Sequence, residues 1–192
     1  NYFGNIKAMS IASLAGTVVI LALSTFIVKL ASKIGKKELS MIGCFISAAS
    51  FILLFIIHTH NVLVWVGLII VATIGTSMFN MVIWAMITDV IDESEVQTGV
   101  RQDGTIYSVY SFARKLGQAC SSGLSGVLLS IIGYTSVTAF DPKVVDGIYN
   151  ITCLVPAGGM ILLLLALCFL YPLNKKRVEE NAEKLRIKRN EK

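Results

Sequence analysis

Charged residues are scarce in this 192-residue sequence. Asp, Glu, Lys and Arg together make up 15% of it, whereas hydrophobic residues make up 55%. An average soluble domain carries about a quarter charged residues, so this composition excludes an ordinary soluble class. The few charges are clustered, and the long windows between the clusters contain almost none. That pattern is typical of a membrane protein.

Cysteine and histidine are also few. The four cysteines all fall inside apolar segments without metal-ligand spacing, so we interpret them as small buried hydrophobes. His58 and His60 are two residues apart in a turn with no other ligand nearby, which predicts solvated loop residues rather than a metal site. A membrane-embedded enzyme would need a nucleophile–base pair or metal ligands at depth, and is the weaker alternative. We expect no metal, cofactor or nucleic-acid partner.

Five apolar segments are each long enough, at about 20 residues, to cross a bilayer as a helix. Because backbone polar groups must be satisfied internally in lipid, helices are the natural prediction. The predicted spans are residues 8–31, 39–57, 62–88, 104–133 and 149–171. The fold class is therefore an all-α polytopic membrane protein, with a transmembrane bundle over residues 1–172 and a basic cytoplasmic tail over residues 173–192.

Lys and Arg predict the orientation. If residue 1 lies outside, only Lys7 and Lys143 lie in outside segments, and the tail with most other cations is cytoplasmic. This matches a multi-pass protein of a bacterial inner membrane. In the tail, Val178, Ala182 and Leu185 have the spacing of a short surface helix attracted to anionic lipid, and a solvated, partly disordered tail is the alternative.

Polar residues form stripes on two neighbouring spans, at about 100° per residue. The stripe of the third span contains Thr73, Thr76, Ser77, Asn80 and Trp84, and that of the fourth contains Ser108, Ser111, Lys115, Gln118 and Ser122. Two such helices can line one aqueous cavity, or the Ser and Thr residues can serve helix–helix packing.

Two cations interrupt the fourth apolar segment. Lys115 falls near the middle of the bilayer, about 16 Å from a helix start at Gly104, so we expect it to face a substrate or ion pathway. A structural ion pair is the alternative. Arg114 lies about 100° round the helix, and we expect it to pair with a carboxylate on a neighbouring helix.

An acidic cluster with one arginine follows the third span. Asp89 and Asp92, like Asp92 and Glu95, are three residues apart and project from one side of a helix end, and Arg101 lies close by. We expect a charged latch, whose ion pairs hold the cytoplasmic side shut and break when the cavity opens inward. A merely solvated acidic loop is the alternative.

These residues have the order Asp89-x-x-Asp92-x-x-Glu95-x-x-Thr98-Gly99-x-Arg101-x-Asp103-Gly104, followed by Tyr107-Ser108 and Arg114-Lys115-x-Gly117-Gln118. This order resembles the C-terminal half of the glycoside–pentoside–hexuronide:cation symporters of the major facilitator superfamily, which include glucuronide, melibiose and xyloside carriers. Residues 31–37 are similar to the basic inter-helix motif of that superfamily. The resemblance implies that the five spans are helices 8–12 of a twelve-helix fold.

The resemblance implies co-transport of a sugar or glycoside with H⁺ or Na⁺ by alternating access. The coupling cation would be held mainly by the N-terminal half, which together with helix 7 would precede residue 1. The resemblance implies a place for Lys115 near the sugar and cation sites. With the polar stripes, the predicted substrate and coupling pathway contains Lys115, Asn80, Trp84, Gln118, Ser111 and Thr76. The resemblance implies a cytoplasmic charged network of Asp89, Asp92 and Arg101, and the predicted cytoplasmic gate adds Glu95 and Arg114. Glu93-Ser94 and Asp103 depart from the family pattern. A carrier of a lipid-like substrate in the same superfamily is the alternative.

Overall fold

The computed structural model describes residues 6–190, apart from the side chains of residues 6–13, 15, 19 and 25, so the Lys7 side chain lies outside the described residues. The described chain forms six helices and no strand, which confirms the all-α prediction. The helices are α1 (Ile6–Ile34), α2 (Lys36–Ile57), α3 (Val62–Thr98), α4 (Asp103–Ile131), α5 (Pro142–Phe169) and α6 (Lys175–Asn190).

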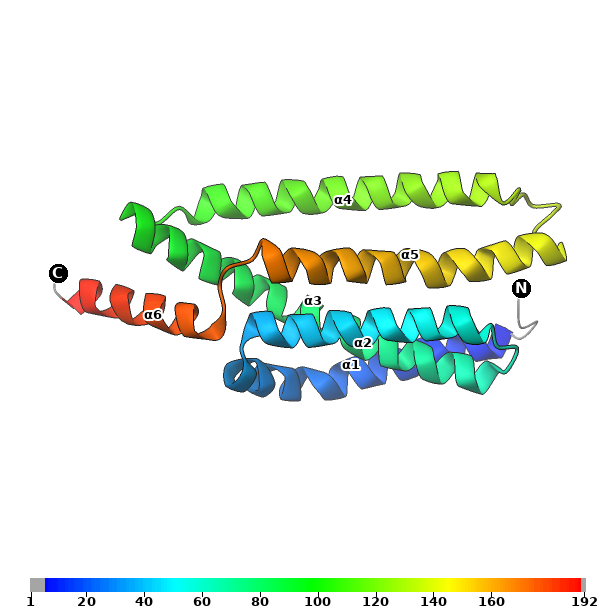
Figure 1. The fold of residues 1–192 in the computed structure, drawn as a ribbon, viewed down its shortest axis with the longest axis horizontal. Coiled ribbons are helices and arrows are strands. Elements are labelled where there is room, and N and C mark those ends of the chain that lie inside the picture. The colour runs from blue at the N-terminus through cyan, green and yellow to red at the C-terminus, as the bar shows by residue number, and fades with distance from the viewer. Residues whose placement is uncertain (1–5, 191–192) are drawn as a thin grey trace.

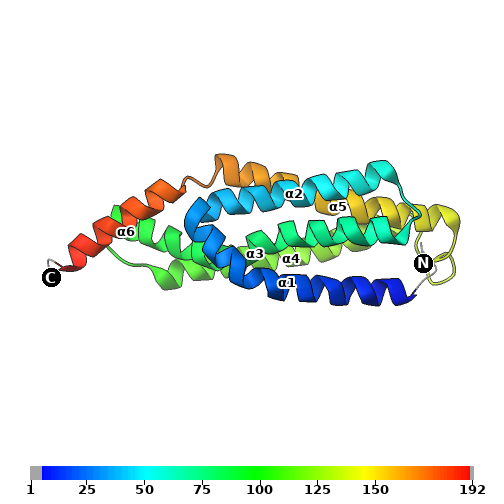
Figure 2. The same ribbon diagram turned by 90° about the horizontal axis from the view of Figure 1, so that it is seen from below.

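α1, α2, α4 and α5 run roughly along one direction, and α3 crosses them obliquely (Figure 1). α2 packs against both α3 and α5, and α1 packs along α3. α4 lies at the edge of the assembly, where its contacts with α3 are sparse. α6 leaves the bundle at the end where α3 finishes and α4 begins, and it packs on α3 (Figure 2).

Three of these helices, α2, α3 and α5, are long and apolar enough to cross a membrane, or four if the bent pair Gly16–Ser24 and Phe26–Ile34 within α1 counts as one span. This supports a polytopic membrane protein. α4 does not meet the same test, because Ser, Gly, Arg114 and Lys115 interrupt its apolar residues. A membrane span at α4 stays a prediction.

Two helices extend beyond the apolar windows that predicted them. α3 continues to Thr98 instead of ending at residue 88, so the acidic cluster is helical rather than a loop. α5 begins at Pro142 instead of residue 149. Proline favours the first turn of a helix because its φ is already helical and its missing N–H would have no partner there.

Two glycines let α2 and α3 approach closely. A Cβ atom placed on Gly43 would lie 2.5 Å from the Gly75 carbonyl oxygen, and one on Gly75 would lie 2.4 Å from the Gly43 carbonyl oxygen. One turn away, the hydroxyl groups of Ser47 and Thr76 form a hydrogen bond of 3.0 Å. Small residues and hydroxyl pairs of this kind let helices pack closely where no hydrophobic effect acts between them.

Near the end of α2, contacts with α5 hold the two helices together. The Tyr149 hydroxyl donates to the Leu54 carbonyl oxygen at 2.8 Å, and both side chains form a buried cluster with Cys153. The expectation that every cysteine is buried is half right. Cys44 and Cys153 are buried, whereas Cys120 and Cys168 lie exposed on the described helices.

Gly43→Ala should destabilise the protein by about 1–3 kcal/mol, because the new methyl group meets the α3 backbone. The control is Gly67→Ala, since no described atom lies within 4 Å of a Cβ at Gly67. Thermal unfolding of the complete gene product in detergent, followed by the loss of helical circular dichroism, measures the difference. Equal shifts in Tm for the two variants would contradict the close contact.

Candidate functional site

An aromatic and cationic cluster lies between α3 and α4. The Trp84 ring lies 6.4 Å from the Tyr107 ring and 5.3 Å from the Tyr110 ring, measured between centroids. The Arg114 guanidinium carbon lies 5.7 Å from the centre of the Trp84 ring, within the range of a cation–π contact. These contacts direct Trp84 toward α4, although its side chain is still 48% exposed. Asn80, one turn earlier, is also exposed.

α4 has no buried residue in the described structure. Ser111, Lys115 and Gln118 are all exposed, and they are spaced at four and three residues along one face. The described helices therefore bring Asn80 and Trp84 to the side of α3 that α4 approaches, but they leave the polar face of α4 uncovered.

Thr76 differs from the other predicted pathway residues. Its hydroxyl is hydrogen-bonded to Ser47 at 3.0 Å and donates to the Ala72 carbonyl oxygen at 3.0 Å. Both hydroxyl contacts lie within or beside the α2–α3 interface. The structure thus favours the helix-packing alternative for Thr76.

Arg101 holds the turn between α3 and α4 together. It donates to Asp92 at 2.8 Å and to Glu95 at 3.1 Å, and it pairs with Asp103 at 2.9 Å. The hydrogen bonds from Arg101 to Asp92, Glu95 and Asp103 raise the pKa of its guanidinium. These ion pairs join residues that are close in the sequence.

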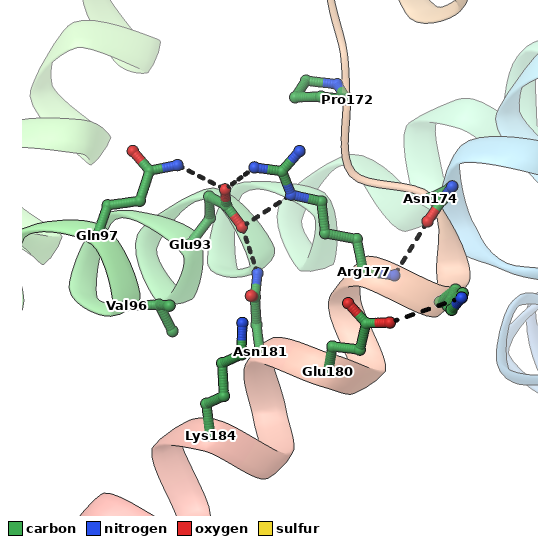
Figure 3. A pocket seen from close by; sticks show the side chains of 10 residues that line it. Glu93, Val96, Gln97, Pro172, Asn174, Arg177, Glu180, Asn181 and Lys184 are labelled. Carbon is green, nitrogen blue, oxygen red and sulfur yellow. Dashed lines mark hydrogen bonds and ion pairs between the residues drawn. The ribbon is translucent and has the colours of Figure 1, made fainter.

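Glu93 provides the long-range contact at this end of the molecule. Arg177 and Asn181 of α6 both donate to its carboxylate, and Gln97 donates from one turn further along α3 (Figure 3). The hydrogen bond with Glu93 also raises the pKa of Arg177. Only 13% of the Glu93 side chain is exposed. We call Glu93, Arg177 and Asn181 the α3–α6 cluster.

Two further contacts extend this junction. Arg189 near the end of α6 pairs with Glu95 at 3.3 Å, and Lys188 donates to the Gly99 carbonyl oxygen at 3.3 Å. A cavity of about 540 Å³ lies beside the cluster. Its lining residues from the two helices are mostly polar, and they include Lys176. Lys184 lies on the same side of α6 (Figure 3). The predicted tail helix is present, and Leu185 is buried.

Asp89 is separate from these pairs and is buried, with 6% of its side chain exposed. Lys36 at the start of α2 donates to its Oδ1 atom at 2.6 Å and to the Ala85 carbonyl oxygen at 3.4 Å. The second oxygen of Asp89 and Oε2 of Glu38 have no hydrogen-bond partner within the described part of the chain. A buried carboxylate is costly without a counter-charge, so Lys36 is needed to keep Asp89 ionised there.

Arg114 and the acidic cluster have other interaction partners than the sequence predicted. Arg114 has no carboxylate within ion-pair distance among residues 6–190 and lies over Trp84 instead. Sequence analysis missed Lys36, Arg177, Asn181 and Arg189 as partners of the acidic cluster. The one available signal was the charge complementarity between five acids at residues 89–103 and the basic tail.

The two histidines lie at the other end of the bundle. His58 Nε2 lies 2.7 Å from Asp146 Oδ1, which links the α2–α3 turn to α5. No group of three or more potential metal ligands occurs within the described residues.

Residues 1–175 match the family described as MFS/sugar transport protein. The chain belongs to this family. It is 38% identical to the "Uncharacterized symporter YjmB" of Bacillus subtilis, over 79% of this chain and 33% of that protein. It is 32% identical to the "Glucuronide carrier protein homolog" of Escherichia coli, over 88% of this chain and 36% of that protein. The chain therefore spans about a third of the length of these relatives. The resemblance to glycoside:cation symporters of the major facilitator superfamily is confirmed.

Arg177→Gln should loosen α6 from α3, because Glu93 loses its cationic partner and keeps only amide donors. Trypsin should then cleave the tail of the complete gene product several-fold faster. Lys176→Gln is the matched control: it also removes one cation and one cleavage site, but its side chain is 86% exposed. High salt should reduce the difference in cleavage rate between wild-type protein and Arg177→Gln, because it screens the Arg177–Glu93 ion pair. Equal cleavage rates for the two variants would show that the cluster does not hold the tail.

Proposed function

We propose that the gene product containing this chain is a secondary active transporter. It co-transports a sugar or glycoside, of the glucuronide, pentoside or galactoside class, with H⁺ or Na⁺ by alternating access. The observation that carries the proposal is the family match over residues 1–175, with relatives named as a symporter and a glucuronide carrier.

The chain would supply helices 8–12 of a twelve-helix fold, with residues 1–172 in the membrane and residues 173–192 as a cytoplasmic tail. Six N-terminal helices and helix 7 would complete it, and the N-terminal half would provide most of the ligands of the coupling cation. The uncovered face of α4 supports this arrangement. Apolar and polar side chains are both exposed on it, and no helix of the described structure covers them. The excess of Lys and Arg in the tail supports a cytoplasmic C-terminus in a bacterial inner membrane.

Sugar binding needs hydrogen-bonding side chains together with an aromatic face. Trp84 would supply the aromatic face, and Asn80, Ser111 and Gln118 would supply donors and acceptors for hydroxyl groups. Lys115 lies about 18 Å along α4 from Asp103, so it would reach the pathway near mid-membrane. The structure gives Thr76 a packing role, and we leave it out of this set.

The cytoplasmic side would be closed by charge. Arg101 holds Asp92 and Glu95 to the start of α4, while Lys36 holds Asp89 beside α2. Because ion pairs exchange partners without covalent change, such a junction can hold one arrangement and release it in another. The names of the relatives favour this transporter over a lipid-like carrier or an enzyme.

Lys115→Ala in the complete gene product should abolish cation-driven uptake of the sugar without loss of membrane insertion, because the pathway loses its mid-membrane charge. Uptake of labelled glycosides and glucuronides is measured in cells lacking sugar carriers, with and without Na⁺ and a proton uncoupler. Lys143→Ala, which removes an exposed cation, is the control.

Two outcomes count against the proposal. Normal uptake by Lys115→Ala would remove Lys115 from the pathway. No uptake of any sugar by the correctly inserted wild-type protein would overturn sugar transport and favour the lipid-like substrate.

A further inference from the structure

Asp89 is a buried acid with only one of its two oxygens in a described contact. The residue is 5% exposed, and its Oδ1 atom accepts a hydrogen bond from the Lys36 ammonium at 2.6 Å. No donor within residues 6–190 reaches its Oδ2 atom, which is itself buried. Because atoms of the described chain already cover Oδ2, helices outside this chain could not reach it without disturbing that packing.

A cavity of about 140 Å³ lies beside this pair, and residues of α1, α2, α3 and α6 line it. Its lining contains both Lys36 and Asp89, together with Ser32 and Glu179, which are exposed. Because exposed residues belong to the lining, the cavity communicates with the surface. A polar cavity of this size admits several water molecules. Water entering from the surface could therefore bring a proton to the Asp89 carboxyl group.

Lys36 is the cation that neutralises Asp89 in the described chain. The other titratable groups around Asp89 or the cavity are Glu38 of α2, Asp92 of α3, Tyr171 after α5, and Lys175 and Glu179 of α6. α1 adds no titratable side chain to the lining. The Lys175 ammonium donates to a carbonyl oxygen of α1 at 2.8 Å and pairs with Glu179 at 3.7 Å, so it is engaged elsewhere. If Lys36 leaves, no cation in this part of the chain is placed to replace it.

The charge of Asp89 keeps this contact closed. Removing one partner of a buried ion pair leaves an uncompensated charge, which is strongly unfavourable. A proton on Oδ2 would remove that charge and would turn an acceptor without a described partner into a donor. Lys36 has 31% of its side chain exposed, so its ammonium can be hydrated once it leaves. Protonation of Asp89 is thus the step that lets the contact open.

Resting on the transport function proposed above, we infer that the Lys36–Asp89 pair is a proton-controlled lock on the cytoplasmic side of the carrier. A proton from cytoplasmic water passes through the cavity and binds Asp89 Oδ2. Lys36 keeps its own protons and moves into solvent, and the start of α2 separates from α3. Loss of the Asp89 proton to water restores the pair. This proton regulates the junction and differs from the coupling cation, which the N-terminal half would hold.

Ser40 is the reporter position for the test. It lies one turn after Lys36 and is fully buried, and its hydroxyl donates to the Met86 sulfur of α3 at 3.4 Å. Ser40→Cys is introduced into the complete gene product, whose native cysteines are replaced by alanine. The rate of its reaction with dithiodipyridine, a small disulfide reagent, is measured in detergent at about pH 5 and about pH 7.5. The thiol should react only when α2 has separated from α3.

Asp89→Asn is the decisive variant, because asparagine has the shape of the neutral carboxyl group and cannot titrate. At about pH 7.5 the reporter should react at least about fivefold more slowly with Asp89 present than in Asp89→Asn. At about pH 5 the two rates should approach each other. Since both proteins carry the same reporter, the pH dependence of the thiol chemistry cancels in their ratio.

Glu38→Gln is the matched control. It removes a neighbouring carboxylate whose Oε2 atom is also buried without a described partner, but it leaves the Lys36–Asp89 pair in place, so the pH step should persist. If Asp89→Asn does not fold, the Ser40→Cys rate is divided by that of the exposed Ser32→Cys, and this ratio should still rise about fivefold as the pH falls.

A ratio that stays constant between the two pH values would overturn the inference. So would a pH step that disappears in Glu38→Gln and persists in Asp89→Asn. The labelling needs no substrate, so these outcomes do not depend on whether a sugar is carried. No uptake of any sugar by the wild-type protein would overturn the transport function, and with it the place of the lock in a carrier, even where the labelling step is present.

Discussion

The length of α3 is the constraint on which the other contacts depend. Its 37 residues span about 55 Å, whereas the hydrocarbon core of a bilayer is about 30 Å thick. The helix can therefore cross the membrane and still project several turns beyond it. Within the bundle it packs on α1 and α2, and its projecting end carries the acids that meet Arg101 and α6. A helix that ended at residue 88 would remove the surface against which α6 mainly packs.

Most charged residues lie outside the packed part of the bundle, because burying a charge without a counter-charge costs free energy. Inside the bundle the α2–α3 contact relies on two glycines and the Ser47–Thr76 hydrogen bond, neither of which brings a charge into the interface. The ion pairs of the described chain lie at the ends of the helices, on α6, or, for Asp89, within α3 where it meets Lys36 at the start of α2. Arg114 and Lys115 are the exceptions, because they lie in the middle of a helix with exposed side chains. In the predicted membrane span at α4, a cation without a counter-charge would serve a substrate or ion pathway rather than packing.

The sequence was sufficient for elements that depend on local pattern, and insufficient for contacts that depend on distant neighbours. Long apolar windows located five helices, but they missed the first turns of α5, because the residues from Pro142 onward are more polar. The spacing of Val178, Ala182 and Leu185 predicted α6, yet its partner is set by how far α3 projects. The stripe on α3 grouped Thr76 with Asn80 and Trp84, although a helix face about 100° wide can serve both a packed interface and an open one.

Glu95 shows how the two ends of this junction can act together. Its carboxylate receives Arg101 at 3.1 Å and Arg189 at 3.3 Å, and Arg101 also pairs with Asp103, the first residue of α4. A displacement of α4 would pull Arg101 with it and would change how much of the Glu95 charge remains for Arg189. The start of α4 and the end of α6 are thus coupled through one shared carboxylate. In a carrier that works by alternating access, this shared charge would make the position of the tail helix depend on the position of the helix that carries Arg114 and Lys115.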